Sequence, residues 1–208
     1  MQWLKPMQVF IKKKCWIMSL NSNLNQLKSM TLSLEGTKFQ LKPVTVNDIT
    51  SAYINWLNDA EIMQHTEQQF RTTSLEDASD YVALMAQSKT DLFYGLFYEG
   101  THIGSIKLGK INPNHKTADL SYIIGDKSFW GMGIASKMIK KMVSLAFERL
   151  ELEKIVAGVY ATNLASIRVL EKNRFVCEGK QRDQFIFRGQ RIDGLIYGRL
   201  KLDWLGEK

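Results

Sequence analysis

The chain has 208 residues, of which 45% are hydrophobic and 24% are charged, an ordinary composition for a globular domain. No apolar run approaches the roughly 20 residues that a membrane helix needs, so we expect no membrane span. The two cysteines, Cys15 and Cys177, form neither a metal-ligand motif nor a disulfide framework. This cysteine usage fits a reducing compartment, and we expect a cytoplasmic protein.

The net charge of +7 suggests nucleic-acid binding, but the distribution of that charge argues against it. Residues 1–34 contain five lysines and no acidic residue, which leaves only +2 for the rest of the chain. The leader also lacks the apolar core and small-residue cleavage site of a signal peptide. We therefore expect no nucleic-acid partner, and we expect residues 1–37 to form a basic, loosely ordered extension that the domain at 38–208 can dispense with.

From residue 39 onward the pattern of apolar residues becomes regular. Strand-like alternation or short apolar runs occupy residues 39–44, 92–98, 103–111, 118–124, 154–160, 175–188 and 191–202. Helical periodicity occupies residues 49–57, 75–85, 134–150 and 165–172. The order strand, two helices, three strands, helix, strand, helix, two strands predicts a mixed α/β domain.

A glycine-rich loop joins the strand at 118–124 to the helix that begins near Ile134. Gly131 and Gly133 let the backbone turn its N–H groups toward a ligand, and the start of a helix adds a partial positive charge. The loop lacks the Gly-Lys-Ser/Thr of a Walker A motif, and no acidic residue ends the next strand as a dinucleotide site requires. The diphosphate of coenzyme A needs only the amides, although a plain strand-to-helix turn would use two glycines as well.

Two motifs carry a resemblance to a known family. The segment 121–136, Ser-Tyr-Ile-Ile-Gly followed after three residues by Phe-Trp-Gly-Met-Gly-Ile-Ala-Ser, resembles motif A of GNAT N-acetyltransferases. The segment 163–175, beginning Asn-Leu-Ala-Ser and ending Glu-Lys-Asn-Arg-Phe, resembles motif B. Ser128 and Arg174 depart from the usual residues, and the style of the loop resembles the RimJ/RimL-like branch.

The resemblance implies a GNAT fold, of class α/β (α+β), with a mixed central sheet of about seven strands, one splayed strand pair and flanking helices. It implies that acetyl-coenzyme A is the co-substrate and that no metal takes part. The residues it assigns to the coenzyme are Leu120, Tyr122, Ile123, Ile124, Trp130, Gly131, Met132, Gly133, Ile134, Ala135, Ser136, Asn163 and Ser166.

The resemblance also suggests catalytic and acceptor-binding residues. Ser166 is expected to protonate or hydrogen-bond the departing thiolate. Asn163 is expected to bond the pantetheine arm or to cap a helix, and the two roles are compatible. Asp119 is a candidate base, although it could equally form a surface ion pair. His65, Glu67 and Tyr122 are expected near the acceptor, while a solvated histidine and a core tyrosine are the simpler alternatives.

The acceptor amine is less well defined by the sequence. The segment around Trp56-Leu57-Asn58-Asp59 resembles members that acetylate nucleotide-linked amino sugars, which favours a small-molecule acceptor such as a 4-amino-4,6-dideoxy sugar. Basic residues at such a site could come from Lys107, Lys110, Lys116, Arg182 and Arg188. Acetylation of a ribosomal or other protein N-terminus, and a non-catalytic coenzyme A-binding module, are the alternatives. A homodimer is plausible.

Overall fold

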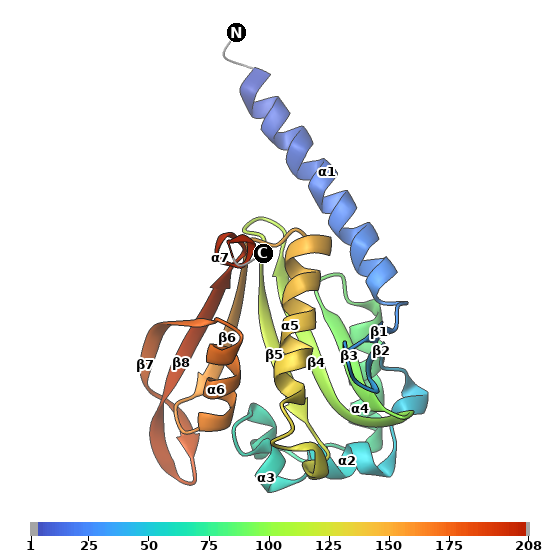
Figure 1. Ribbon diagram of the computed structural model, residues 1–208, viewed down its shortest axis with the longest axis vertical. Coiled ribbons are helices and arrows are strands. Elements are labelled where there is room, and N and C mark those ends of the chain that lie inside the picture. The colour runs from blue at the N-terminus through green and yellow to red at the C-terminus, as the bar shows by residue number, and fades with distance from the viewer. Residues whose placement is uncertain (1–3, 207–208) are drawn as a thin grey trace.

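The computed structural model describes residues 4–206, with the backbone alone for residues 4–13. Residues 1–3 of the expected extension and the last two residues of the expected domain lie outside this range. Eight strands form one sheet in the order β1-β2-β3-β4-β5-β6-β8-β7 (Figure 1). The strands are β1 (Leu32–Ser33), β2 (Phe39–Pro43), β3 (Leu92–Tyr98), β4 (Thr101–Asn112), β5 (Thr117–Ile124), β6 (Lys154–Tyr160), β7 (Val176–Phe187) and β8 (Gln190–Leu200).

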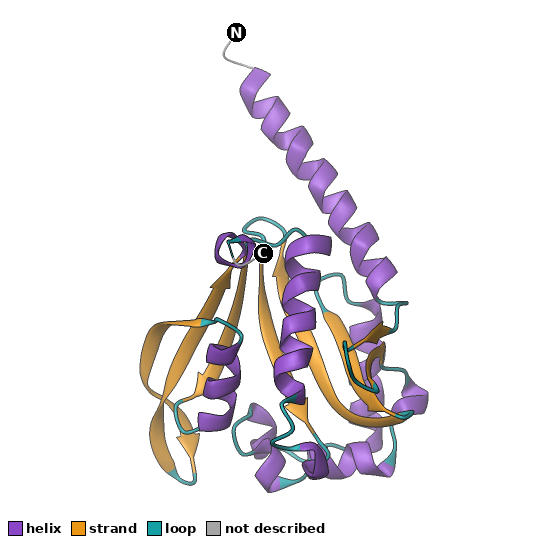
Figure 2. Cartoon of the chain, viewed as in Figure 1, coloured by secondary structure: helices purple, strands orange, loops and turns teal. Residues whose placement is uncertain are grey.

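Helices cover both faces of this sheet, as the mixed α/β prediction requires (Figures 1 and 2). The α-helices are α1 (Leu4–Leu27), α2 (Ser51–Leu57), α3 (Ala60–Met63), α4 (Leu75–Gln87), α5 (Ile134–Ser144), α6 (Leu164–Lys172) and α7 (Lys201–Leu205). Short 3-10 helices at Glu67–Phe70 and Lys127–Phe129 connect them, and a π-helical turn at Leu145–Arg149 continues α5. Among the described residues, no helix is both long enough and apolar enough to cross a membrane.

The long helix α5 packs on one face of the sheet through the stripe that its periodicity predicts. Ile134, Met138, Ile139, Met142 and Val143 are all buried in the main core cluster. Residues three and four positions apart share one side of a helix, so these five side chains form a continuous apolar surface. Helices α2 and α4 lie on the opposite face, so the sheet separates them from α5.

Strands β5 and β6 pair in parallel over only three residues each. Thr117–Asp119 is in register with Lys154–Val156, and beyond that point the two strands diverge (Figure 1). Up to Ile124, β5 stays paired with β4, while β6 stays paired with β8 up to Tyr160. The residues of β5 from Leu120 to Ile124 therefore have a ladder partner on one side only, which is the splayed pair that the family resemblance implies.

The expectation of a loosely ordered segment before residue 38 is wrong for the described part of it. Residues 4–27 form a helix, and its last two turns bury Leu20, Leu24 and Leu27 in the main core (Figure 1). The spacing of these leucines places them on one helical face. The sequence did not predict this helix, because Asn and Ser residues surround the three leucines. Most of the stability of such a helix comes from packing its apolar face against the rest of the domain.

Polar contacts also fix the end of α1 to the domain. The Asn23 side-chain amide donates to the carbonyl of Arg149 at 2.7 Å. The Lys28 ammonium, which follows the helix, donates to the carbonyls of Met85 and Ala86 at 2.9 and 3.2 Å. These carbonyls belong to the last turn of α4, where a cation is favourable, so α1 and α4 are joined at their C-terminal ends.

Replacing Leu24 with alanine tests whether α1 is an integral part of the fold. We expect the L24A variant to lose about 2–5 kcal/mol of unfolding free energy, because it removes a fully buried side chain and leaves a cavity. The matched control is Met18→Ala on the same helix, where the side chain is 67% exposed. Chemical denaturation should show a change of less than about 0.5 kcal/mol for the control. Equal losses for both variants would contradict the packing of α1.

Candidate functional site

The glycine-rich loop is shaped by two residues with left-handed backbone. Gly131 has φ 75° and Gly133 has φ 74°, and a Cβ built on either would meet no atom within 4 Å. The requirement for glycine therefore comes from the backbone conformation and not from crowding. Gly133 immediately precedes α5, so the loop places the unpaired amides of the first helical turn at its end.

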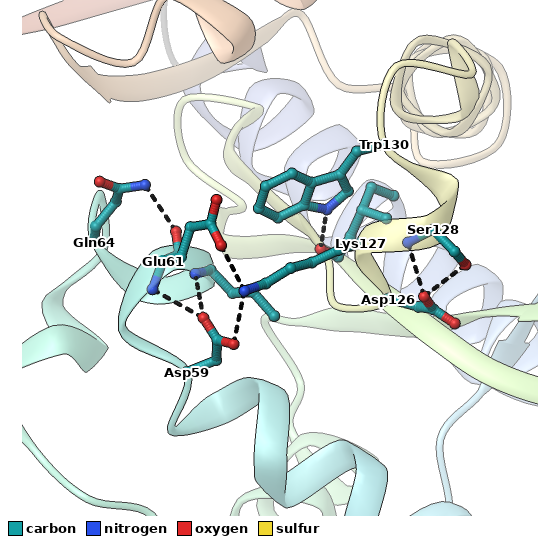
Figure 3. A network of polar contacts seen from close by, with 9 residues as sticks. Asp59, Glu61, Gln64, Asp126, Lys127, Ser128 and Trp130 are labelled. Carbon is teal, nitrogen blue, oxygen red and sulfur yellow. Dashed lines mark hydrogen bonds and ion pairs between the residues drawn. The ribbon is translucent and has the colours of Figure 1, made fainter.

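Side chains just before the two glycines hold the loop in place (Figure 3). The Asp126 carboxylate accepts hydrogen bonds from the amide and the hydroxyl of Ser128 at 2.9 and 2.7 Å. The indole N–H of Trp130 donates to the carbonyl of Ile124 at 2.9 Å, which closes the loop against the end of β5. The loop is thus held as a defined turn by bonds within the chain.

Lys127 connects this loop to the helices on the other side of the sheet (Figure 3). Its ammonium lies 2.8 Å from a carboxylate oxygen of Asp59 and 2.6 Å from one of Glu61. The other oxygen of Asp59 accepts the amides of Glu61 and Ile62 and so caps α3. The Lys127 hydrogen bond, followed by the amide bonds, lowers the pKa of Asp59, so its carboxylate stays charged at neutral pH.

Most of the segment Trp56-Leu57-Asn58-Asp59 has structural roles. The Trp56 ring covers Gly125 so closely that a Cβ there would lie 1.6 Å from a ring carbon. Asn58 exchanges hydrogen bonds with the backbone of Thr73 at 2.8 and 2.9 Å, and Asp59 caps α3. Packing and capping account for Trp56, Asn58 and Asp59, while Leu57 lines the cavity of about 510 Å³ described below.

Tyr122 and Ser166 meet across the splayed strands. Tyr122 lies on β5 and Ser166 in the first turn of α6, and their hydroxyl oxygens are 2.6 Å apart. Asn163 caps α6, because its side-chain oxygen accepts the amide of Ser166 at 3.1 Å. Burial raises the pKa of Tyr122, although the hydrogen bond with Ser166 opposes this, so the phenol is protonated at neutral pH.

Ser136, which the resemblance also assigned to the coenzyme, lies in the first turn of α5. Its hydroxyl accepts a hydrogen bond from the side-chain amide of Asn173 at 2.9 Å. This bond links α5 to the end of α6. Ser136 therefore helps to set the distance between the two helices that start beside the divergent strands.

A cavity of about 510 Å³ lies on the sheet face opposite α5. It is bounded by α2, α4 and the segment between them, and by β3, β4 and the unpaired part of β5. Many of its lining side chains carry hydroxyl groups, namely Tyr53, Thr66, Thr72, Thr73, Tyr81, Ser105, Ser121 and Tyr122. The lining includes the consecutive residues Ser121, Tyr122 and Ile123, so the cavity borders the unpaired part of β5, while Ser166 does not line it.

His65 and Glu67 are close to this cavity but do not line it. The hydroxyl of Tyr160, at the end of β6, donates to Glu67 at 2.9 Å. The His65 ring stacks on Phe187 of β7 at a centroid distance of 4.8 Å. Both residues therefore connect the segment after α3 to the divergent half of the sheet. Burial, with a smaller effect from Arg188, lowers the pKa of His65, so its imidazole is neutral at pH 7.

Asp119 is not brought to the same place. It lies in the paired part of β5, opposite Val156, and its carboxylate is 3.0 Å from the ammonium of Lys110 on the surface. Asp119 does not line the cavity and has no described contact with Ser166. The simpler alternative considered for this residue, a surface ion pair, is the one that the structure supports.

Of the five basic residues suggested for the acceptor site, one lines the cavity. This residue is Lys107; the other four contact surface partners elsewhere. Arg71 also lines the cavity, and no sequence signal pointed to it. Tyr160, Phe185 and Phe187 were missed as well, because strand alternation shows which side chains are buried but not what they contact across a gap.

The residues present fit coenzyme A. A diphosphate needs amides at a helix start, and the turn at Gly131 and Gly133 supplies them with open space around both glycines. An extended pantetheine arm needs hydrogen-bonding backbone, and Leu120–Ile124 offers a strand edge that β6 does not cover. Within residues 4–206, no group of three or more His, Cys, Asp or Glu residues could hold a metal ion.

Comparisons with known proteins agree with this fit. The family model of the Acetyltransferase (GNAT) domain matches residues 38–176. YdaF of Bacillus subtilis (strain 168), provisionally named a ribosomal N-acetyltransferase, is 36% identical over 114 residues, which is 55% of this chain and 62% of YdaF. The ribosomal-protein-serine acetyltransferase of Escherichia coli (strain K12) is 29% identical over 105 residues, 50% of this chain and 58% of that protein. The chain thus matches about three fifths of the length of these relatives.

A solved structure extends the likeness in fold to nearly the whole domain. The ribosomal-protein alpha-N-acetyltransferase RimL, in complex with coenzyme A, superposes with a TM-score of 0.74 at 23% identity. The superposition covers 82% of this chain and 98% of RimL. The element order and the splayed strands described above are therefore those of a known acetyltransferase fold.

A methyl group at Gly125 should disrupt the packing of the Trp56 ring on the end of β5. We expect Gly125→Ala to lower the unfolding free energy by about 1–3 kcal/mol or more, because the Trp56 ring must move. The control is Gly158→Ala on β6, where a Cβ meets no atom within 4 Å. This control should change the unfolding free energy by less than about 0.5 kcal/mol. Thermal unfolding of both variants measures this, and an unchanged G125A melting temperature would contradict the close packing.

Proposed function

Since the chain belongs to the GNAT acetyltransferase family, we propose that it transfers an acetyl group from acetyl-coenzyme A to a primary amine. The observation that carries this proposal is the meeting of three features at one end of β5. These are the uncovered strand edge at Leu120–Ile124, the glycine turn before α5, and the hydroxyl pair of Tyr122 and Ser166.

In this proposal the diphosphate of the coenzyme binds the amides between Gly131 and Ser136. The pantetheine arm binds along β5, where the backbone from Leu120 to Ile124 can pair with it as a further strand would. A backbone N–H of this edge would also stabilise the oxyanion that forms when the amine attacks the thioester. The coenzyme supplies the activated acetyl group, so no protein nucleophile is needed.

Ser166 is the proposed proton donor to the sulfur as the carbon–sulfur bond breaks. A serine hydroxyl is a weak acid, and its donation becomes easier when a second donor replaces the proton that it gives up. We propose Tyr122 for this role, because its phenol is protonated at neutral pH and its oxygen lies 2.6 Å from that of Ser166. The proton that the amine nitrogen loses passes to water, and water returns one proton to the phenol, so the thiol and the amide form with no net change in the enzyme. Asn163 fixes the helix turn that presents Ser166, and acts as a positioning residue.

For the acceptor we propose a compact polar amine, with an amino sugar or sugar nucleotide as the first candidate. The hydroxyl-rich lining of the cavity supports it, since such side chains donate and accept hydrogen bonds as sugar hydroxyls do. The N-terminus of a protein is the second candidate, because both curated relatives carry names of ribosomal acetyltransferases. A coenzyme-binding module without turnover remains the alternative of another class.

Two further proposals concern the setting of the enzyme. Cys15 and Cys177 are free and exposed, which suits a reducing compartment, and we propose the cytoplasm. Strand β7 ends the sheet and carries the exposed side chains of Val176 and Ile186, 63% and 45% accessible. An edge of this kind can pair with a second copy, so a homodimer through β7 stays a prediction.

Incubation with acetyl-coenzyme A and a panel of amines tests the activity. The panel holds UDP- and dTDP-linked amino sugars, N-terminal peptides of ribosomal type, and spermidine. Release of thiol together with a gain of one acetyl mass on an acceptor is the expected result. Coenzyme binding without modification of any amine would instead support the non-catalytic module.

Two glycine variants show whether the turn before α5 binds the coenzyme. Gly133→Ala should weaken binding of coenzyme A by about tenfold or more, because the strained backbone moves amides that contact the diphosphate. The control is Gly189→Ala in the turn between β7 and β8, which has the same left-handed backbone at φ 77° and no atom within 4 Å of an added Cβ. Equal coenzyme affinity in calorimetric titrations of the two variants would contradict the assignment.

The roles of Ser166 and Tyr122 can be separated by a double-mutant cycle. We expect Ser166→Ala to reduce kcat by about 10²-fold and Tyr122→Phe by a smaller factor. If Tyr122 acts through Ser166, the double variant should be no slower than Ser166→Ala alone. Independent multiplication of the two losses would show that Tyr122 acts by another route. Tyr98→Phe on β3 controls for the loss of a phenol outside the site.

A further inference from the structure

The charged side chains of the large cavity are few and unevenly matched. Among its lining residues, only Arg71, Lys107 and Asp77 carry a charge at neutral pH. All other lining side chains are neutral and either apolar or hydrogen-bonding. The electrostatic preference of the cavity therefore depends on these three groups.

The single acidic residue is already engaged. One carboxylate oxygen of Asp77 accepts the amide of Ser74 at 2.8 Å and its hydroxyl at 2.6 Å, which forms the capping box of α4. These bonds, with a smaller contribution from the charge of Arg71, lower the pKa of Asp77. Asp77 thus stays charged but has half of its hydrogen-bonding capacity committed to the helix end.

The two cations have no comparable partner. The Lys107 ammonium donates to the hydroxyl of Tyr81 at 3.0 Å and lies 5.5 Å from the centre of that ring. The backbone amide of Arg71 donates to the carbonyl of Gln68 at 3.1 Å, which holds the chain at the cavity wall. Among the described residues, neither Arg71 nor Lys107 forms an ion pair with a carboxylate at a nitrogen-to-oxygen distance of 4.0 Å or less.

The position of Lys107 relates this charge to the reaction. On β4 it is the register partner of Ser121 on β5, one residue before Tyr122. Because neighbouring residues of a strand point to opposite faces of the sheet, Lys107 and Ser121 share one face and the Tyr122 side chain lies on the other. A molecule in the cavity that reaches Ser121 on β5 would therefore lie beside Lys107. Arg71 lines the same cavity and also an adjacent one of about 450 Å³, so a longer acceptor would pass both cations.

We propose that the cavity recognises the acceptor through an anionic group held by Arg71 and Lys107, so that the substrate is an amine that also carries a phosphate or a carboxylate. This inference rests on the proposed acetyl transfer. Two cations that form no ion pair within 4.0 Å, beside one carboxylate that is committed to a helix cap, attract an anion and disfavour a polycation such as spermidine. A guanidinium and an ammonium are the groups that proteins use to bind phosphates and carboxylates.

Matched pairs of amines test this inference and identify the source of the anion. The first pair is a UDP-linked amino sugar and the same free amino sugar. The second pair is an N-terminal peptide with Asp and Glu after its first residue and the same peptide with Asn and Gln there. Spermidine is the cationic reference. Each is titrated calorimetrically into the protein saturated with coenzyme A, and kcat/KM is measured with acetyl-coenzyme A.

We expect the anionic member of at least one pair to bind about tenfold more tightly than its neutral counterpart. The reason is that hydrogen bonds to charged groups are stronger than those between neutral groups. Lys107→Gln and Arg71→Gln should each remove most of that preference, measured as the ratio of the two affinities within each pair. Lys38→Gln, which removes a cation from an exposed surface pair, should leave the preference intact. A preference confined to the sugar pair identifies a phosphate, and one confined to the peptide pair identifies carboxylates.

Equal binding within both pairs, or tightest binding of spermidine, would overturn the inference. Because binding is measured without turnover, this outcome is distinct from failure of the proposed function, in which no panel member is acetylated. A preference that is unchanged in both cavity variants would also overturn it, since the anion would then be held elsewhere.

Discussion

The divergence of β5 from β6 is the constraint on which the rest of the structure depends. Backbone N–H and C=O groups need partners, and a strand inside a sheet normally finds them on both sides. Here the parallel ladder stops after Asp119 and Val156, so the remainder of β5 has an uncovered edge in the middle of the domain. Such an edge is stable only if a ligand or solvent satisfies it, which explains why the proposed coenzyme site and the proposed acceptor cavity both meet there.

The divergent halves are joined again at several points by polar and aromatic contacts. Tyr122 reaches Ser166, Tyr160 reaches Glu67, and Phe187 stacks on His65. Lys127 adds a connection between the glycine turn and the cap of α3. These contacts hold the two divergent halves of the sheet at a fixed separation. Acyl transfer between two bound substrates requires such a fixed geometry.

The domain also depends on an element outside the family model, which begins at residue 38. The last turns of α1 fill part of the main core, and Lys28 binds the end of α4, which in turn borders the proposed acceptor cavity. The position of α4 is therefore supported from both ends, by the Ser74 capping box and by α1. This arrangement links the N-terminal helix α1 to the wall of a cavity whose lining residues lie between Tyr53 and Ile123.

The splayed strand pair was implied by the resemblance to a known family, whereas the sequence alone determined the order of the main elements from residue 39, the glycine turn and the motif that contains Asn163 and Ser166. These features are local, because periodicity, turn chemistry and short spacings are set by neighbouring residues. The helical order of α1 and the cavity role of Arg71 could not be predicted, and neither could the contact between Tyr122 and Ser166. Each of these depends on atoms that are far apart in the chain, and only the tertiary structure decides which of them meet.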